Sequence, residues 1–371
     1  MTPAYGTFAQ LPGARRRADI EVDFAGSERL VGLYEVPGDS RQVTHYVLDH
    51  PLFALQGPGR IYTDDDDAGP FAADATKFAF FCAAACAALA RGALPMPSVL
   101  HLHDWQTALV LLLRAHVPEF APLRAARIVY TIHNLAMQGV RPLRGYDSAL
   151  ETWYPDLEYD EQIVVDPRWS DCVNPMAIGI RLADAINTVS PTYAREILEP
   201  SDPARGYSGG EGLEDDLRAV KAAGKLTGIL NGCTYPEDSA SKPTWEALVG
   251  TLCAEVCQWI AREPSVRSAH YLADKRLAAL PAGRPATLLT SIGRLTEQKA
   301  RLFRERTKGG ASALESILAS VGPGGLLVMV GSGARDYERY FSEMAARHER
   351  FLFINGYSEE VAQSLYASGD L

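Results

Sequence analysis

Short apolar runs alternate along this chain with longer stretches of helical spacing. Strands are predicted at 98–102, 127–132 and 185–189, and each run ends on polar residues. Helices are predicted at 106–116 and 192–198, where the apolar positions recur with helical spacing. Strands that alternate with helices are typical of a parallel sheet covered by helices. The hydrophobic pattern therefore predicts the α/β fold class.

Polar side chains follow each of these predicted strands. His103 and Asp104 follow the first strand, His133 and Asn134 the second, and Ser190 the third. Ligands of parallel α/β sheets bind beyond the carboxyl ends of the strands. We therefore expect the five residues to converge on one crevice, although a hydrogen-bonded core pair is an equally good interpretation of the two residues of the second strand.

The same pattern stops and then restarts in the last quarter of the chain. The segment 281–285 is rich in Pro and Gly, which is typical of an interdomain joint. Beyond it, further strands and helices are predicted at 286–292, 325–330, 334–348, 351–354 and from Ser358 onward. We therefore predict two domains, residues 1–283 and 284–371.

Composition and charge exclude several classes of function. Lys and Arg number 36 against 46 Asp and Glu, so the net charge of −10 argues against a nucleic-acid partner. The longest apolar run, Phe78–Ala90, is 13 residues, short of the roughly 20 that span a bilayer. Met1–Gln10 has no secretory pattern. Six Cys without a framework spacing favour a reducing compartment, so we expect a cytoplasmic protein without a membrane partner.

Two features of the second predicted domain suit an anion. Arg294 and Lys299 follow its first strand and could clamp a diphosphate through charge-assisted hydrogen bonds. Gly331 and Gly333 follow its second strand and could let the backbone approach a phosphate. Taken singly, each has an ordinary alternative, namely surface charge for the cations and a tight turn for the glycines.

The cysteines do not predict a metal centre. Cys82 and Cys86 are four residues apart, as are Cys253 and Cys257. A structural metal site usually takes four ligands in tighter pairs with His nearby. We interpret these cysteines as small apolar side chains on helices and predict no metal site.

Five segments occur together in a fixed order: His101–Trp105, Thr131–Gly139, Thr188–Ile197, Gly228–Gly232 and Arg294–Lys299. This series resembles the bacterial glycogen synthase and plant starch synthase family, from about residue 74 to residue 371. The resemblance implies two Rossmann-like domains of the glycosyltransferase B type that face a deep cleft. It implies a retaining hexosyltransferase that moves glucose from ADP-glucose to the non-reducing end of an α-1,4-glucan such as glycogen. It implies no metal and no cofactor, because ADP-glucose is a substrate.

The resemblance also implies roles for single residues. Arg294 and Lys299 match the pair that holds the nucleotide diphosphate and stabilises its charge as it leaves. His133 matches the histidine beside the donor glucose. Asp104 matches an active-site carboxylate, with Trp105 next to it.

Further matches concern substrate binding. Asn231 matches an asparagine of the donor-sugar pocket, and Asn134 is expected to contact substrate beside the histidine that precedes it. Tyr357 matches the aromatic residue that stacks on adenine. Gly331 and Gly333 match the glycine turn under the nucleotide.

The chain also departs from the family pattern. The family's Lys-x-Gly-Gly-Leu loop has no counterpart here, where Met1–Tyr5 begins after it, and Ser368–Leu371 stops before the family's Glu-Pro-Cys-Gly-Leu segment. These departures predict a fragment with an incomplete second domain, which transfers glucose more slowly than a full-length family member. The chain is then expected to lack part of the nucleotide site.

Two other functions stay open on the sequence. One is a related glycosyltransferase with a different acceptor, and the other is a non-catalytic glucan-binding derivative. A screen of glycan acceptors separates the first from a glycogen synthase, and a transfer assay separates the second.

Overall fold

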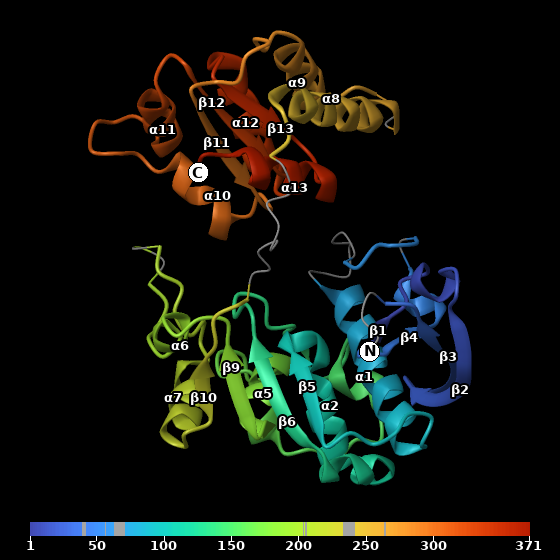
Figure 1. Cartoon of the computed structure of the whole chain (residues 1–371). Helices are drawn as coiled ribbons and strands as arrows, with labels where there is room; N and C mark the ends of the chain where they lie inside the picture. Colours follow the sequence, from blue (N-terminus) through green and yellow to red (C-terminus); the bar gives the residue numbers. More distant parts are fainter. Residues whose placement is uncertain are drawn as a thin grey trace. The chain divides into compact units, whose positions relative to one another are not determined.

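The computed structural model describes residues 1–38, 42–55, 57–62, 71–202, 204, 206–232, 242–262 and 265–371. It divides the chain into two compact units, Met1–Cys233 and Thr234–Leu371 (Figure 1). Each unit buries its own hydrophobic core, so each is considered by itself.

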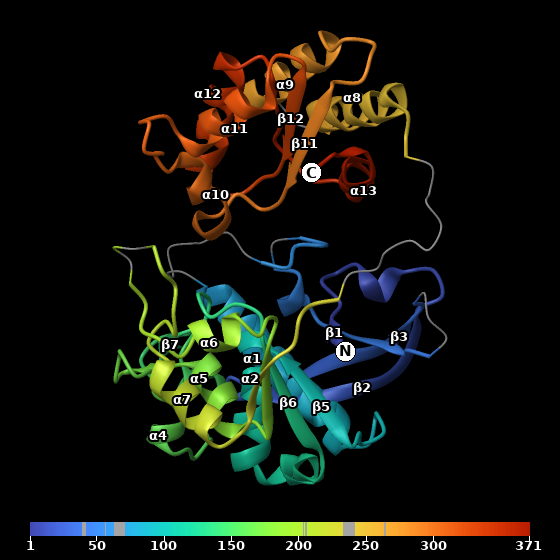
Figure 2. The ribbon, with the colours of Figure 1, turned by 60° about the vertical axis from the view of Figure 1, so that its left-hand side comes forward.

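A parallel sheet forms the centre of the first unit. Its strands run in the order β10 (Leu226–Gly228), β9 (Ala185–Thr188), β6 (Arg127–Ile132) and β5 (Val99–His103). Helix α2 (Asp104–His116) contacts both α1 (Ala72–Ala90) and α5 (Pro175–Leu182), and Figure 2 shows α1 and α2 side by side. Each predicted strand and helix of this region is present, with ends shifted by a few residues.

Helix α1 is the core helix of the first unit. Its own alanine, phenylalanine and cysteine side chains point outward on every side of the helix, and 16 of its 19 residues are buried. It is long and apolar enough to cross a membrane by length and composition, but its most apolar window is 89% buried inside the structure. A helix that is apolar all round and covered by protein is a core element.

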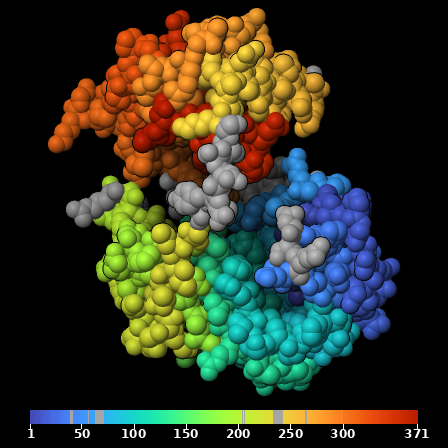
Figure 3. Space-filling model, viewed as in Figure 1, coloured from blue at the N-terminus to red at the C-terminus, as the bar shows by residue number. Residues whose placement is uncertain are grey.

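A second sheet of the first unit is mixed. Its order is β1 (Thr2–Pro3), β4 (His45–Asp49), β3 (Ser27–Val36) and β2 (Arg15–Phe24), and β2 and β3 form an antiparallel hairpin. Ile20, Val22 and Phe24 alternate with exposed charged residues, so one face of the hairpin joins the core and the other meets solvent. These dark-blue strands form one side of the surface of this unit (Figure 3).

Short elements complete the first unit. They are three 3-10 helices, Phe8–Gln10, Pro51–Phe53 and Pro118–Ala125, with α3 (Leu150–Trp153), α4 (Glu161–Val164), α6 (Tyr193–Glu196), α7 (Glu214–Ala222), β7 (Arg141–Pro142) and β8 (Cys172–Val173). Strands β7 and β8 pair antiparallel.

The second unit is a three-layer sandwich. Its parallel strands are β11 (Thr287–Ile292), β12 (Gly325–Val330) and β13 (Phe351–Ile354), in that order, and they match the predicted strands closely. Val328 and its alternate neighbours on β12 pack against α8 and α13, while Met329 and Leu327 pack against α11 and α12. The helices are α8 (Trp245–Arg262), α9 (Ser268–Ala278), α10 (Glu297–Arg304), α11 (Ala313–Val321), α12 (Arg335–Arg347) and α13 (Glu359–Ser368).

The boundary between the units differs from the predicted one. The sequence places it after residue 283, whereas the structure places it after residue 233. Helices α8 and α9 pack on each other and bury Leu248, Leu252 and Leu277 in the core of the second unit. The segment 281–285 therefore joins α9 to β11 inside this unit and is not an interdomain joint.

Candidate functional site

Asp104 begins α2 at the carboxyl end of β5, with its backbone in the left-handed region at φ 51°. An aspartate tolerates this conformation better than most residues, but it still stores strain. Its Oδ1 atom accepts hydrogen bonds from the main-chain amides of His133, at 2.7 Å, and Asn134, at 3.4 Å. The carboxylate thereby ties the loop after β6 to the end of β5, and three of the predicted site residues come together.

The ionisation of Asp104 reflects these surroundings. Burial raises the pKa of the Asp104 carboxyl above its ordinary value, and the amide donors of His133 and Asn134 oppose that rise. The N-terminus of α2 also favours negative charge at this position. The carboxyl group is thus held in one orientation, with part of its surface removed from water.

Three histidines and two hydroxyl or amide side chains form a continuous array at the same edge of the sheet. His103 Nδ1 lies 3.0 Å from His133 Nε2, and the rings of His101 and His103 lie 4.3 Å apart. Thr131 donates to Asn187 Oδ1 at 2.7 Å and lies 2.6 Å from His101 Nε2. Because the threonine hydroxyl has only one proton, His101 Nε2 donates to it. We define these five residues as the histidine array.

From the sequence, His103 was placed beside the crevice without a role, His101 and Thr131 were named only as the first residues of two family segments, and Asn187 was given no part. The available signal is the spacing of His101 and His103, since residues two apart on a strand share one face. Their partners are 30 residues away in sequence and could be found only from the pairing of β5 with β6.

A pH effect on stability follows from the array. Partial burial, followed by His101, His133 and the Met1 ammonium, lowers the pKa of His103 to about 4 from its ordinary 6.5. Between these values the unfolded chain binds a proton that the folded chain does not, so stability falls as the pH falls from about 6.5 to 4. His103→Gln is expected to lose less thermal stability than the wild type between pH 7 and pH 4.5.

The measurement is the melting temperature at both pH values. His116→Gln, at the far end of α2 and outside the array, serves as the control. An equal loss in the wild type and in His103→Gln contradicts the role of His103.

The other residues predicted for the first unit lie in different settings. Trp105 is only 4% exposed, and its ring meets Phe78 edge to face at 5.4 Å. Ser190 Oγ accepts hydrogen bonds from the amides of Thr192 and Tyr193, so it closes the turn that precedes α6. Asn231 is exposed in the segment after β10. His103, Asp104, His133 and Asn134 are thus the predicted residues of this unit that the structure joins directly.

In the second unit, Arg294 and Lys299 lie in the loop after β11 and in the first turn of α10. Both side chains are exposed, and within the described ranges neither makes a hydrogen bond or an ion pair. They line a cavity of about 300 Å³ together with Gly293, Leu295 and Phe303. Two uncompensated cations at the carboxyl end of a parallel sheet are an arrangement that suits an anionic ligand.

The turn that contains Gly331 and Gly333 is hydrogen-bonded to the loop that carries Arg294. Leu295 donates to Ser332 O at 2.9 Å, and its own carbonyl accepts from Ala334 at 2.8 Å. A Cβ atom on Gly331 would lie 2.2 Å from Gly293 O, and one on Gly333 would lie 2.5 Å from Leu295 O. Only glycine allows so close an approach of the two backbones, so both residues position the cation loop.

Gly331→Ala is therefore expected to push the two loops apart. Forcing a methyl group into a packed site typically costs about 1–3 kcal/mol, and here the obstacle is a backbone oxygen. Thermal unfolding of the variant should begin at lower temperature than that of the wild type. Gly250→Ala in α8 is the matched control, because no heavy atom lies within 4 Å of its new Cβ. Equal thermal stability in the wild type and in Gly331→Ala contradicts the positioning role.

Tyr357 lies beside the same turn. Its side chain is 62% exposed, and its hydroxyl donates to Glu359 Oε2 at 2.5 Å. The residue lines a cavity of about 270 Å³ with Ser332, Trp259 and two arginines, Arg262 and Arg267. Since Ser332 also bonds to the cation loop, Tyr357, Gly331, Gly333, Arg294 and Lys299 form one neighbourhood of the second unit.

Comparison with known proteins gives the family of the chain. The family model described as starch synthase catalytic domain matches residues 1–219. The chain belongs to this family. The sequence resemblance is thereby confirmed.

Individual members of the starch synthase family extend the likeness over almost all of the chain. A glycogen synthase of Anaeromyxobacter sp. (strain Fw109-5) is 32% identical over 100% of this chain and 70% of its own length. A glycogen synthase of Streptococcus equi subsp. equi (strain 4047) is 31% identical over 92% of this chain and 63% of its own. The chain thus spans less than two thirds of the length of this relative.

A solved member of the starch synthase family shares the fold. The catalytic domain of starch synthase IV from Arabidopsis thaliana, bound to ADP and acarbose, matches with a TM-score of 0.69 at 25% identity. The match covers 97% of this chain and 66% of that chain. It confirms the predicted α/β fold class, with Rossmann-like parallel sheets of the glycosyltransferase B type.

Proposed function

We propose that this chain is a glucosyltransferase of glycogen biosynthesis, which moves glucose from ADP-glucose to the non-reducing end of an α-1,4-glucan with retention. Its relatives are named glycogen synthase, and the related starch synthase IV was solved with ADP and acarbose. The observation on which the proposal rests most heavily is the pair Arg294 and Lys299, which is exposed, uncompensated and fixed beside a glycine turn. We place the reaction in the cytoplasm.

Each unit then has its own part in the reaction. We assign nucleotide-sugar binding to the second unit, where Arg294 and Lys299 neutralise the diphosphate and stabilise it as it leaves. Tyr357 stacks on the adenine, while Gly331 and Gly333 position the loop that binds the phosphates. We assign the acceptor side to the first unit.

In the first unit, we assign Asp104 and His133 to the surroundings of the reacting donor sugar. His133 contacts the donor glucose, and Asn134 and Asn231 bind substrate through their amides. Asp104 supplies a fixed negative charge and holds the amides of the loop after β6. Trp105 contributes its packing beneath this loop. The reaction draws on no cofactor and no metal, since charge on the leaving group is neutralised by cationic side chains.

Nucleotide and acceptor choice test the proposal together. The purified chain is incubated with ADP-glucose or UDP-glucose as donor. The acceptor is glycogen, fructose (which would give sucrose) or none. We expect ADP release from ADP-glucose that depends on glycogen, and much slower UDP release from UDP-glucose. Release with an unrelated acceptor in place of glycogen identifies a different transferase, and binding of glycogen without any release identifies a non-catalytic glucan-binding protein.

A further inference from the structure

A cavity of about 350 Å³ lies in the first unit beside the loop after β6. It is lined by Trp105, Met137, Gly139, Trp169 and Glu211, among others. Its volume falls in the range of small-molecule sites, about 300–1,000 Å³. The roles proposed above for Asp104 and His133 do not explain why Trp169 and Glu211 line this cavity.

Trp169 forms an exposed but rigid part of this wall. Its side chain is 50% exposed, and the guanidinium of Arg168 lies 4.4 Å from the centre of its ring. The amide of Trp169 donates to Asp166 Oδ1 at 3.1 Å. One face of the indole is therefore occupied by a cation, and the backbone is fixed, while half of the ring stays open to a ligand.

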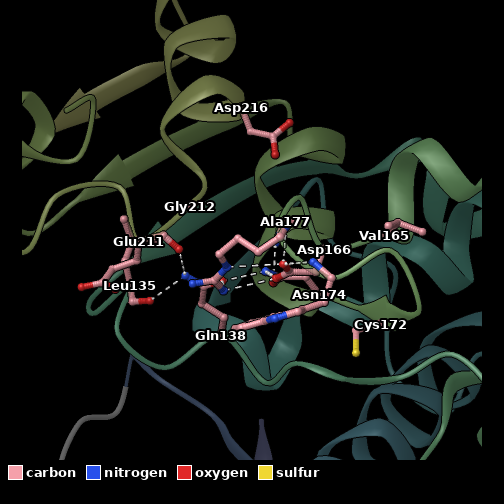
Figure 4. A network of polar contacts seen from close by, with 12 residues as sticks. Leu135, Gln138, Val165, Asp166, Cys172, Asn174, Ala177, Glu211, Gly212 and Asp216 are labelled. Carbon is pink, nitrogen blue, oxygen red and sulfur yellow. Dashed lines mark hydrogen bonds and ion pairs between the residues drawn. The ribbon is translucent and has the colours of Figure 1, made fainter. Parts of the chain in front are cut away.

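A polar network lies beside this tryptophan, and Figure 4 shows Gln138, Asp166 and Asn174 in it. Asp166 accepts hydrogen bonds from Arg168 and from Asn174 Nδ2, the latter at 2.6 Å, and Gln138 Oε1 accepts from the same two side chains at 2.8 and 2.7 Å. Asp166, Asn174 and Gln138 are 1%, 0% and 6% exposed. Such a network is costly to bury unless every member is bonded, and when bonded it is rigid.

The ionisation of Asp166 agrees with that arrangement. Burial by itself raises the pKa of Asp166, but hydrogen bonds from Arg168 and Asn174 outweigh it and bring the pKa below the ordinary value. The carboxylate therefore stays charged at neutral pH and keeps its ion pair with Arg168.

The carboxylate of Glu211 supplies hydrogen-bond acceptor oxygens to the same cavity. Its backbone is held in the left-handed region at φ 52°, and its carbonyl accepts from Gln138 Nε2 at 3.0 Å. Across the residues that the structure describes, its carboxylate has no hydrogen bond and no ion pair. The strained loop thus presents free acceptor oxygens where the network ends.

We propose that this cavity binds a glucosyl unit of the acceptor glucan, with Trp169 as its stacking platform and Glu211 as acceptor for its hydroxyl groups. The inference rests on the proposed function. The charges on the wall favour a neutral ligand, because Arg168 and Arg141 repel a cation and Glu211 repels an anion. A sugar ring combines apolar C–H faces for the indole with hydroxyl donors for the carboxylate.

The experiment is a calorimetric titration of maltoheptaose into the full chain, without nucleotide. Trp169→Ala is expected to weaken binding about tenfold, equivalent to about 1.4 kcal/mol. Trp169→Phe keeps a platform and should bind nearly as well as the wild type. Tyr146→Ala, at another aromatic residue of this unit that is 63% exposed, is the control. Melting temperature and ADP affinity should be unchanged in all three variants.

The outcomes separate this inference from the proposed function. If the wild type binds maltoheptaose and Trp169→Ala binds it equally well, the site is overturned and the proposed function stands. If the wild type binds ADP but neither binds nor elongates any malto-oligosaccharide, both are overturned. Loss of binding in Trp169→Ala together with a lowered melting temperature, and without rescue by Trp169→Phe, also overturns the platform, because it indicates a structural role.

Discussion

Replacing Arg294 or Lys299 by alanine is expected to lower glucosyl transfer by about a hundredfold or more. Each side chain supplies charge-assisted hydrogen bonds to the diphosphate, worth about 1.5–3 kcal/mol before the extra charge of the transition state is counted. Removal of one preorganised group of this kind typically costs about 10²–10³-fold in kcat. The measurement is the rate of ADP release from ADP-glucose, together with ADP affinity, in each variant.

The loss should be specific to the nucleotide. Neither cation makes a hydrogen bond or ion pair within the described part of the chain, so the melting temperature and glucan binding are expected to persist in both variants. Arg339→Ala, at an exposed position on α12, removes the same charge from the second unit and is the control. Unchanged turnover in Arg294→Ala and in Lys299→Ala would show that these cations are ordinary surface charge.

Asp104→Asn is expected to have the second large effect, again about 10²-fold in kcat. Asparagine tolerates the left-handed backbone at φ 51° and its Oδ1 can still accept the amides of His133 and Asn134, so the fold should be retained. Only the negative charge is removed. The assay is the rate of transfer per folded molecule, with the melting temperature measured on the same sample.

Two companion variants separate charge from structure. Asp104→Ala loses the amide acceptor and keeps the strained backbone, so it should lower the melting temperature where Asp104→Asn does not. His133→Ala should lower the rate far more than the stability, because its side chain is exposed. A normal rate per folded molecule in Asp104→Asn and His133→Ala would assign both residues to structure alone.

Buried parallel strands could be predicted from the sequence almost to the residue. Strands β12 and β13 begin and end where the apolar runs do, because helices cover both faces and every residue of these strands is buried. The glycines after β12 and the cations after β11 follow from the same logic, since turns and ligand groups lie at the carboxyl ends of strands.

The hairpin β2–β3 was not predicted, although exposed and buried residues alternate in its first strand from Asp19 to Phe24. Half of its residues face solvent, so it lacks the continuous apolar run by which the helix-covered parallel strands were predicted. The unit to which α8 and α9 belong could not be predicted either, because the apolar face of a helix does not specify which hydrophobic core it packs against. Their packing on the second unit moved the domain boundary.

The polar contacts of the candidate site depend on tertiary structure. His103 meets His133 and Asp104 meets the same loop only because β5 and β6 pair in one register. Trp105 follows Asp104 directly, yet the direction of α2 turns its ring into the core. The network around Asp166 joins segments that no local pattern connects.

The most direct measurement is transfer of labelled glucose. The chain is incubated with glycogen and ADP-glucose labelled in the sugar, and the product is digested by an enzyme that removes α-1,4-linked units from non-reducing ends. The account predicts that label enters the glycogen, that the digestion releases it, and that the Arg294→Ala and Lys299→Ala variants incorporate about a hundredfold less. Label that stays out of the glucan while ADP still binds, or label that enters equally in these variants, would contradict it.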